Sequence, residues 1–123
     1  MTPAELLDWQ WRGYPRYHRS RANLLLHIVV VPLFLAGNVG LLFALAQRSV
    51  LLAMACLAAM GISVALQGRG HGTEQNPPEP FTSRGNAVAR IFLEQWVTFP
   101  RFVLSGGWLA ALRAASRGEG QRT

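Results

Sequence analysis

The stretch LLLHIVVVPLFLAGNVGLLFALA, residues 24–46, decides the fold of this chain of 123 residues. It contains no charged residue when His27 is neutral. As an α-helix it would be about 34 Å long, enough to cross a hydrocarbon core of about 30 Å. Pro32 and two glycines lie inside it. They would disfavour one helix in water, but a membrane span tolerates them, so we expect a transmembrane helix that is kinked at Pro32.

A second uncharged run, VLLAMACLAAMGISVALQ, occupies residues 50–67. As a helix it would be about 27 Å long, and its many small residues suit close helix–helix contact in lipid. Only Gln47, Arg48 and Ser49 separate the two runs, which predicts a tight antiparallel hairpin. The alternative is a soluble helical bundle with two buried helices, but runs of 23 and 18 uncharged residues are long for that.

The composition also favours lipid. Half of the residues are hydrophobic and 15% are charged, against about 25% charged residues in an average soluble domain. The net charge of +6 comes entirely from arginine. No zinc-finger spacing or aromatic RNA-binding motif accompanies it, so we expect no nucleic-acid partner; the charge alone keeps a nucleic-acid accessory protein as a third alternative. A single cysteine, Cys56, excludes an intrachain disulfide.

The arginines predict the orientation in the membrane. Only Arg48 lies in the connecting turn, whereas four arginines precede the first run and three follow the second before residue 91. The positive-inside rule then places both termini in the cytoplasm. No signal peptide is evident at the N-terminus, and we expect an integral protein of the bacterial inner membrane.

The flanking segments complete an all-α, single membrane-embedded domain over residues 1–123. Residues 1–22 are aromatic and polar and predict an interfacial helix that begins with a capping box at Thr2 and breaks at Gly13 and Pro15. The glycine- and proline-rich residues 68–85 predict a loop. Residues 86–113 predict one amphipathic helix, bent at Pro100.

The hairpin brings all three histidines to the same side of the membrane. His27 lies in the first turn of the first span, His18 precedes it, and His71 follows the second span together with Glu74. Imidazole with a carboxylate suits iron, zinc, manganese or nickel, and open positions on such a site suit Fe(II) and oxygen chemistry. Each residue also has a structural interpretation: His18 and Glu74 as ordinary surface groups, His27 as a hydrogen-bonded span residue, and His71 as a solvated loop residue.

Three further residues are candidates for substrate binding. Asn23 either caps the first span or binds a ligand. Arg69 and Arg21 lie on the histidine side and can pair with an anionic head group. Tyr14 and Tyr17 are interpreted as anchors at the membrane interface.

Two segments resemble a known family. YHRSRANLLLHIVVVP, residues 17–32, resembles the start of the small membrane dioxygenases of phytosphingosine breakdown, and Gln67-Gly68-Arg69-Gly70-His71-Gly72 with Glu74 resembles their second motif. The resemblance covers roughly residues 14–33 and 66–80. It departs from the fungal members in the number of spans, in the position of Glu74 and in the residues that follow it, which suggests a bacterial branch.

The resemblance implies an activity and a ligand set. The family is Fe(II)-dependent and uses O2 to shorten a 2-hydroxy fatty acid by one carbon. Carried over to this chain, His18, His27 and His71 would be metal ligands, and Glu74 a fourth ligand or a residue that supports them. A second function class stays open, a non-catalytic membrane adaptor or subunit that docks a partner through the C-terminal helix.

Overall fold

The computed structural model describes residues 1–122, with side chains described for residues 1–118. Every regular element in that range is helical, which confirms the all-α prediction. The elements are α1 (Pro3–Tyr17), α2 (Arg21–Ala46), α3 (Val50–His71), α4 (Arg84–Leu93), the π-helix η1 (Glu94–Thr98), α5 (Phe99–Leu104) and α6 (Gly107–Arg122).

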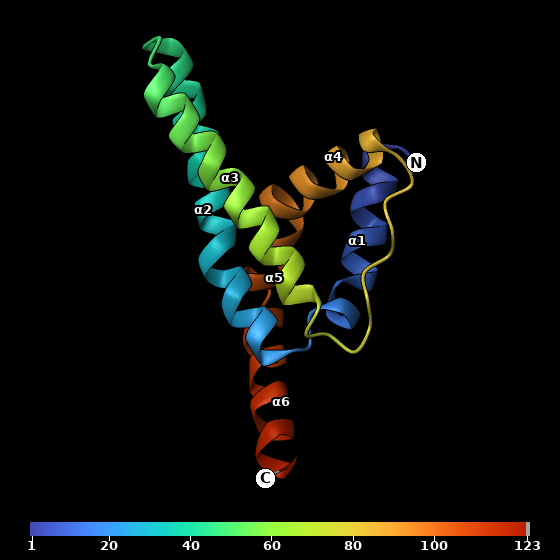
Figure 1. Cartoon of the computed structure of the whole chain (residues 1–123). Helices are drawn as coiled ribbons and strands as arrows, with labels where there is room; N and C mark the ends of the chain where they lie inside the picture. Colours follow the sequence, from blue (N-terminus) through green and yellow to red (C-terminus); the bar gives the residue numbers. More distant parts are fainter. Residues whose placement is uncertain (123) are drawn as a thin grey trace.

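Helices α2 and α3 form the predicted antiparallel hairpin (Figure 1). They approach so closely that a β-carbon at Gly37 would lie 2.8 Å from the Met60 side chain, and one at Gly40 would lie 2.6 Å from Sγ of Cys56. The turn between them places Arg48 at a φ of 55°. Small residues therefore set the distance between the two helices, as close packing in lipid requires.

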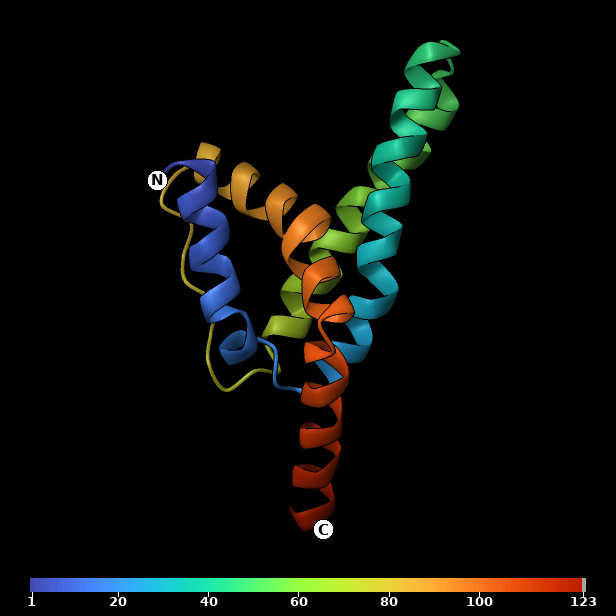
Figure 2. The same ribbon diagram turned by 180° about the vertical axis from the view of Figure 1, so that it is seen from behind.

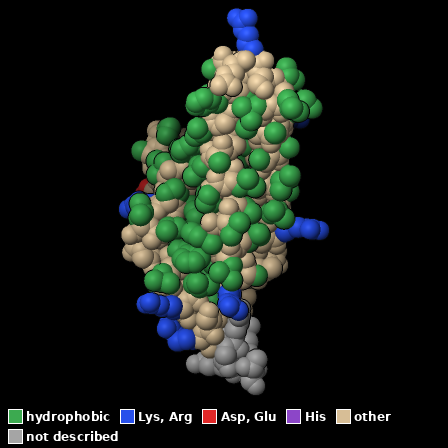
Figure 3. Space-filling view, turned by 90° about the vertical axis from the view of Figure 1, so that its left-hand side faces the viewer, with side chains coloured by type: hydrophobic (Ala, Val, Ile, Leu, Met, Phe, Trp, Pro, Cys, Tyr) green, Lys and Arg blue, Asp and Glu red, His purple; other side chains and the backbone are tan. Residues whose placement is uncertain are grey.

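Both hairpin helices are long and apolar enough to cross a membrane. Many of their apolar side chains point outward: Leu42 is 69% exposed and Leu51 is 81% exposed. Within the most apolar 18-residue stretch of α3, only 11% is buried inside the protein. Hydrophobic side chains cover the length of the hairpin in Figure 3. A core helix of a soluble bundle would be covered by protein, so this exposure favours a membrane span.

The remaining helices form a second body beside one end of the hairpin (Figures 1 and 2). A small core of Tyr14, Leu24, Val31, Phe99 and Phe102 joins α1, α2 and α5. Trp108 of α6 packs against this core, and its indole N–H donates a hydrogen bond of 2.9 Å to the carbonyl oxygen of Leu24. This packing fixes α1 and η1 against the end of the hairpin where the histidines lie.

Helix α1 begins with the predicted capping box, in which Thr2 and Glu5 exchange hydrogen bonds of 3.0 and 3.2 Å. The predicted break at Gly13 and Pro15 is wrong, because α1 continues to Tyr17 with Pro15 inside it. Its buried residues recur every four positions, at Leu6, Gln10 and Tyr14, and Tyr14 lies between Gly13 and Pro15. Tertiary packing of that face therefore outweighs the local preference for a break.

The predicted loop over 68–85 begins too early. Helix α3 continues to His71, so the loop covers residues 72–83. Gly70 explains the extension, because a β-carbon there would collide with Oδ1 of Asn23. The glycine lets the end of α3 pack directly on the start of α2 and bury Asn23 completely.

The prediction of a single helix over 86–113 is also wrong in detail. This segment contains most of α4, then η1, α5 and the first turns of α6. The chain turns at Ser105 and Gly106, and not at Pro100. Gly106 has a φ of 83°, a conformation that favours glycine. Pro100 follows the π-helix η1 in the first turn of α5, where a proline needs no backbone donor.

Candidate metal centre

His18 and His27 are oriented by backbone carbonyls one helical turn earlier in the chain. Nδ1 of His18 lies 2.9 Å from the Tyr14 carbonyl oxygen, and Nδ1 of His27 lies 3.0 Å from that of Asn23. A carbonyl oxygen only accepts, so each Nδ1 carries the proton and donates it. Each Nε2 then keeps its lone pair for another partner, the arrangement that orients metal-binding histidines.

The three imidazole rings enclose a common space. Their centroids are 4.8 to 5.1 Å apart, and each pair of rings is nearly perpendicular, with interplanar angles of 80° to 89°. His18 follows α1, His27 lies in the first turns of α2, and His71 ends α3. The end of α1, the start of α2 and the end of α3 therefore supply one imidazole each, on one side of the hairpin as predicted.

Glu94, the first residue of η1, supplies the carboxylate of the cluster. Its Oε1 lies 3.6 Å from Nε2 of His18 and 4.0 Å from Nε2 of His27. One ligand atom from each of His18, His27, His71 and Glu94 can be chosen so that all four lie within 4.8 Å of one another. No motif in the sequence indicates Glu94 as a ligand, although it is the one acidic residue of the segment 86–113 and lies among aromatic residues.

The π-helical turn explains how Glu94 reaches the histidines. A π-turn widens a helix locally and changes which side chains face inward. Here it turns Gln95 and Thr98 fully into the interior. Gln95 exchanges two hydrogen bonds of 2.8 Å with Gln67 of α3, and Thr98 donates one of 2.7 Å to Gln10 of α1. These bonds hold η1, and with it Glu94, between α1 and α3.

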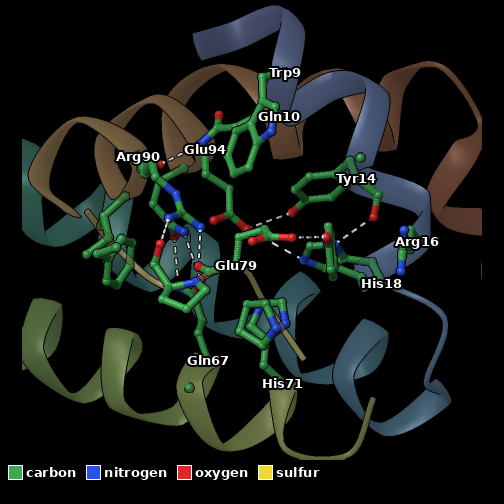
Figure 4. Close-up of a pocket in the computed structure, with 18 of the residues that line it drawn as sticks. Trp9, Gln10, Tyr14, Arg16, His18, Gln67, His71, Glu79, Arg90 and Glu94 are labelled. Atoms are coloured by element: carbon green, nitrogen blue, oxygen red, sulfur yellow. Dashed lines mark hydrogen bonds and ion pairs between the residues drawn. The ribbon is translucent and has the colours of Figure 1, made fainter. Parts of the chain in front are cut away.

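Tyr14 contacts the cluster in three ways. Its ring stacks on His18 with centroids 3.7 Å apart and an interplanar angle of 10°. Its hydroxyl donates a hydrogen bond of 3.0 Å to Oε1 of Glu94, and its carbonyl accepts from His18. Figure 4 shows the Tyr14, His18 and Glu94 side chains turned toward one another. The expected role of Tyr14 as an interface anchor is wrong, because the side chain is buried.

The charge of Glu94 suits a cation. Burial raises the pKa of the Glu94 carboxyl, but the proximity of His18, followed by that of His27 and His71, whose rings would stabilise the carboxylate when protonated, outweighs burial and lowers the pKa to about 2. The carboxylate is therefore ionised at neutral pH. Burial, followed by the charge of Glu94, raises the pKa of Tyr14 well above its ordinary value, so the phenol stays a donor.

The imidazole nitrogens that could bind a metal ion have no hydrogen-bond partner in the described part of the chain. Nε2 of His18, Nε2 of His27 and Nδ1 of His71 are all buried without one. The 3.6 and 4.0 Å separations from Glu94 are too long for hydrogen bonds. Two atoms that each bind one ion at about 2.1 Å lie up to roughly 4.2 Å apart. The ligand atoms, which lie within 4.8 Å of one another, would need to move together by about half an ångström at the widest separation to bind one ion. Their spacing therefore fits a shared metal ion better than hydrogen-bonded imidazole–carboxylate pairs.

The prediction that Glu74 is a metal ligand is wrong, since it is absent from the cluster, whereas its contacts agree with the alternative of a residue that supports the histidines. Its Oε1 accepts hydrogen bonds of 2.9 and 3.0 Å from the backbone N–H groups of Arg19 and Ser20, and its Oε2 accepts one of 2.8 Å from Asn23. The carboxylate thus closes the junction between α1 and α2. This positions His18 and His27, which flank the junction, and Glu94 takes the place in the cluster that the sequence assigned to Glu74.

The three predicted substrate-binding residues lie away from the open part of the site. Asn23 is fully buried and donates to Glu74, which supports its interpretation as a structural residue. Arg69 is exposed and lines neither of the two cavities described for the chain. Arg21 lines a second cavity, between the α1–α2 junction and α6, that the histidines do not line.

A cavity of about 650 Å³ opens beside the cluster (Figure 4). His18, His71 and Glu94 line its inner end, and its lining arginines are Arg12, Arg16 and Arg90. Helices α1, α3 and α4 and residues 78–81 of the loop form its walls. A small molecule can therefore approach the histidine–glutamate cluster from this side.

Comparison of the chain with models of protein families, with curated proteins and with solved structures finds no match. What the site can do follows from its own chemistry. Three imidazoles and one carboxylate at the end of a cavity form a group that can hold a metal ion.

Proposed function

We propose that the protein is an integral membrane enzyme, an Fe(II)-dependent dioxygenase that shortens 2-hydroxy fatty acids by one carbon. One observation carries the proposal: three buried, unpartnered imidazole nitrogens and an ionised carboxylate surround one point at the inner end of a cavity. Histidines with one carboxylate are the donor set of non-haem Fe(II) oxygenases. The resemblance of residues 17–32 and 67–74 to the phytosphingosine-pathway dioxygenases supplies the substrate.

The residues present fit such an ion. His18, His27, His71 and Glu94 would hold it, since their free donor atoms converge and no other polar group satisfies the imidazole nitrogens. When bound, iron would mediate the transfer of four electrons from the 2-hydroxy acid to O2, a reaction that amino-acid side chains do not perform, with the carboxyl carbon released as CO2 and one water formed.

The chain's own residues orient the site. The carbonyl oxygens of Tyr14 and Asn23 keep the protons of His18 and His27 on Nδ1. The Tyr14 hydroxyl holds Oε1 of Glu94 at 3.0 Å. Because these groups are fixed before any ligand arrives, binding an ion costs little ordering of the side chains.

The cavity suggests how an anionic substrate is oriented. Arg12 pairs with Asp8, and Arg90 donates to the carbonyl oxygens of Glu79 and Pro80. Arg16 lies over the Tyr17 ring at 5.8 Å and makes no ion pair within the described part of the chain. We assign Arg16, in place of Arg69 or Arg21, as the arginine that pairs with the substrate carboxylate.

The membrane setting fits a lipid substrate. We place α2 and α3 across the bilayer with both termini in the cytoplasm, in a bacterial inner membrane, because Arg48 is the one arginine in the turn at the far end of the hairpin. The cluster then lies at the cytoplasmic end of the spans. A fatty acid reaches this depth with its carboxylate at the interface and its chain in the hydrocarbon.

The test is oxygen-dependent chain shortening by detergent-purified protein, reconstituted with Fe(II) under anaerobic conditions and given a long-chain 2-hydroxy fatty acid. The wild type is expected to release an acid one carbon shorter, and His71→Ala and Glu94→Gln are expected to release none. Glu79→Gln is the matched control, because Glu79 lines the same cavity outside the cluster.

The other outcomes also decide between functions. Stoichiometric iron without product would reject the substrate and retain the metal centre. Neither iron nor product would reject the enzyme and favour a membrane adaptor.

A further inference from the structure

We infer that the cavity beside the cluster is an acyl-chain chamber that a fatty acid enters sideways from the bilayer, between α1 and α3, with Gly68 at the mouth. The inference deepens the proposed function, on which its choice of substrate rests. The occupant is the aliphatic chain of a fatty acid, as the side chains that line the cavity and the exposed position of Gly68 indicate.

Away from the cluster, apolar side chains from four different parts of the chain line the cavity, beside Arg12, Glu79 and Arg90, whose charged or polar groups have partners within the protein. Trp9 belongs to α1, Val64 to α3, Phe81 to the loop and Ile91 to α4. The two glutamines that also line the cavity, Gln67 and Gln95, bond each other in a reciprocal pair at 2.8 Å. An aliphatic chain can therefore pass them without breaking their hydrogen bonds.

The mouth lies on a helix that has the properties of a membrane span. Gly68 lines the cavity and is also exposed, and a β-carbon added there would meet nothing within 4 Å. Val64 and His71 line the cavity as well, and positions 64, 68 and 71 recur at helical spacing on one side of α3. Along this side of α3, the lining runs from Val64 in the apolar part of the helix to His71 in the histidine cluster.

The opposite wall is held shut by Arg90. Its guanidinium lies 4.9 Å from the Trp9 ring centroid and 4.5 Å from that of Phe81, and it donates to the carbonyl oxygens of Glu79 and Pro80. The loop is thereby fastened to α1 and α4. Because these contacts hold the loop in place on that side, we place the entrance for lipid at the exposed Gly68 of α3.

The polarity of the cavity gives the direction of the ligand. Its inner end carries His18, His71 and Glu94, and Arg16 lies near them, as Figure 4 shows for the labelled side chains. The rest of its lining offers the aromatic and aliphatic side chains of Trp9, Val64, Phe81 and Ile91 beside charged groups that already have partners. An amphipathic acid matches this gradient with its carboxylate inward and its chain toward the membrane.

The first test uses the full-length, metal-free protein in phosphatidylcholine vesicles with a 2-hydroxy fatty acid that carries a diazirine in mid-chain. Light-induced adducts are expected on the chamber walls, at Trp9, Val64, Phe81 and Ile91, and an excess of the unmodified 2-hydroxy fatty acid should remove them. Adducts confined to outward residues of the hairpin, or adducts that do not compete, would overturn the inference and indicate adventitious lipid contact only.

The second test places a larger side chain at Gly68 to obstruct the proposed entrance. Gly68→Leu is expected to reduce the competed labelling at least 10-fold, whereas Gly61→Leu should leave it unchanged. Gly61 is the matched control, because it also lies on α3, is exposed, and offers a β-carbon the same open space, but does not line the cavity. Equal labelling in both variants would place the chain outside the chamber.

These outcomes distinguish a failure of the acyl-chain chamber from a failure of the proposed reaction. Both tests are performed without iron, so a failed chain-shortening assay leaves them valid. Labelling of the chamber without activity would retain the lipid site and reject the reaction. Activity without chamber labelling would retain the reaction and reject this route of entry.

Discussion

The hydroxyl of Tyr14 donates a 3.0 Å hydrogen bond to Oε1 of Glu94, across 80 positions of sequence. The same ring stacks on His18. One aromatic side chain thus fixes both an imidazole and the carboxylate of the cluster. Supporting groups of this kind set the orientation of metal ligands, and their removal lowers metal affinity about 10- to 100-fold in other proteins.

Tyr14→Phe should therefore weaken metal binding about 10-fold while the protein stays folded, since the ring and its stacking remain. Titration of the metal-free protein with Co(II), followed by its visible absorption, measures the affinity and the ligand geometry together. Tyr17→Phe is the control, because the Tyr17 hydroxyl bonds Glu79 outside the cluster at 3.3 Å. Equal affinities for the two variants would contradict a positioning role for Tyr14.

Glu94→Gln should lose metal affinity, whereas Glu74→Gln should lose stability. Without its carboxylate, the cluster of Glu94→Gln should lose most of its metal affinity. Glu74→Gln should still bind metal but lose about 2 kcal/mol of stability, because its charge-assisted bonds to Arg19, Ser20 and Asn23 weaken. Metal titration and denaturation in mild detergent distinguish the two effects, and loss of metal from Glu74→Gln in a fully stable protein would reinstate it as a ligand.

Metal should stabilise the fold. An ion that binds only the folded state at 100 times its dissociation constant adds about 2.7 kcal/mol. Three helices and η1 each supply one ligand, so this stabilisation should appear as a higher melting temperature for the whole protein. A chelator should reverse the increase, and the His27→Ala variant should show none. An identical increase in His27→Ala would mean that the ion binds elsewhere.

Gly70→Ala should destabilise the protein by about 1–3 kcal/mol, because the new β-carbon collides with Oδ1 of the fully buried Asn23. Gly68→Ala, two residues earlier in α3, should be neutral or stabilising, because its β-carbon meets open space and alanine favours the helix. Thermal unfolding of the two variants side by side measures the difference. A stable Gly70→Ala variant would show that α2 and α3 pack less closely at their histidine ends.

The hairpin and the gathering of the histidines could be predicted because both depend on local pattern. Two uncharged runs joined by three residues admit one antiparallel arrangement, and that arrangement brings His18, His27 and His71 to one end. The end of α3 was placed too early because the glycines at 68 and 70 favour a loop locally. Contact between Gly70 and Asn23, which no local pattern encodes, extends the helix.

The carboxylate could not be predicted for a different reason. Glu74 was chosen because it lies three residues from His71, but the chain turns after α3 and aims its side chain at the α1–α2 junction. Glu94 reaches the cluster from a separate helix, through a π-turn held by Gln95 and Thr98. Hydrophobic spacing does not reveal a π-turn, and the bonds that hold it join distant parts of the chain.

The order of the four cluster residues along the chain has a consequence for biosynthesis. Ribosomes release the N-terminal part first, so His18, His27 and the hairpin with His71 emerge before Glu94, which comes 23 positions after His71. Imidazoles alone give a neutral pocket, and the negative charge that balances a divalent ion arrives with η1. Tight binding of a divalent ion would thus depend on completion of the C-terminal third, and a chain truncated before residue 94 should hold such an ion less tightly because it lacks the carboxylate of the cluster.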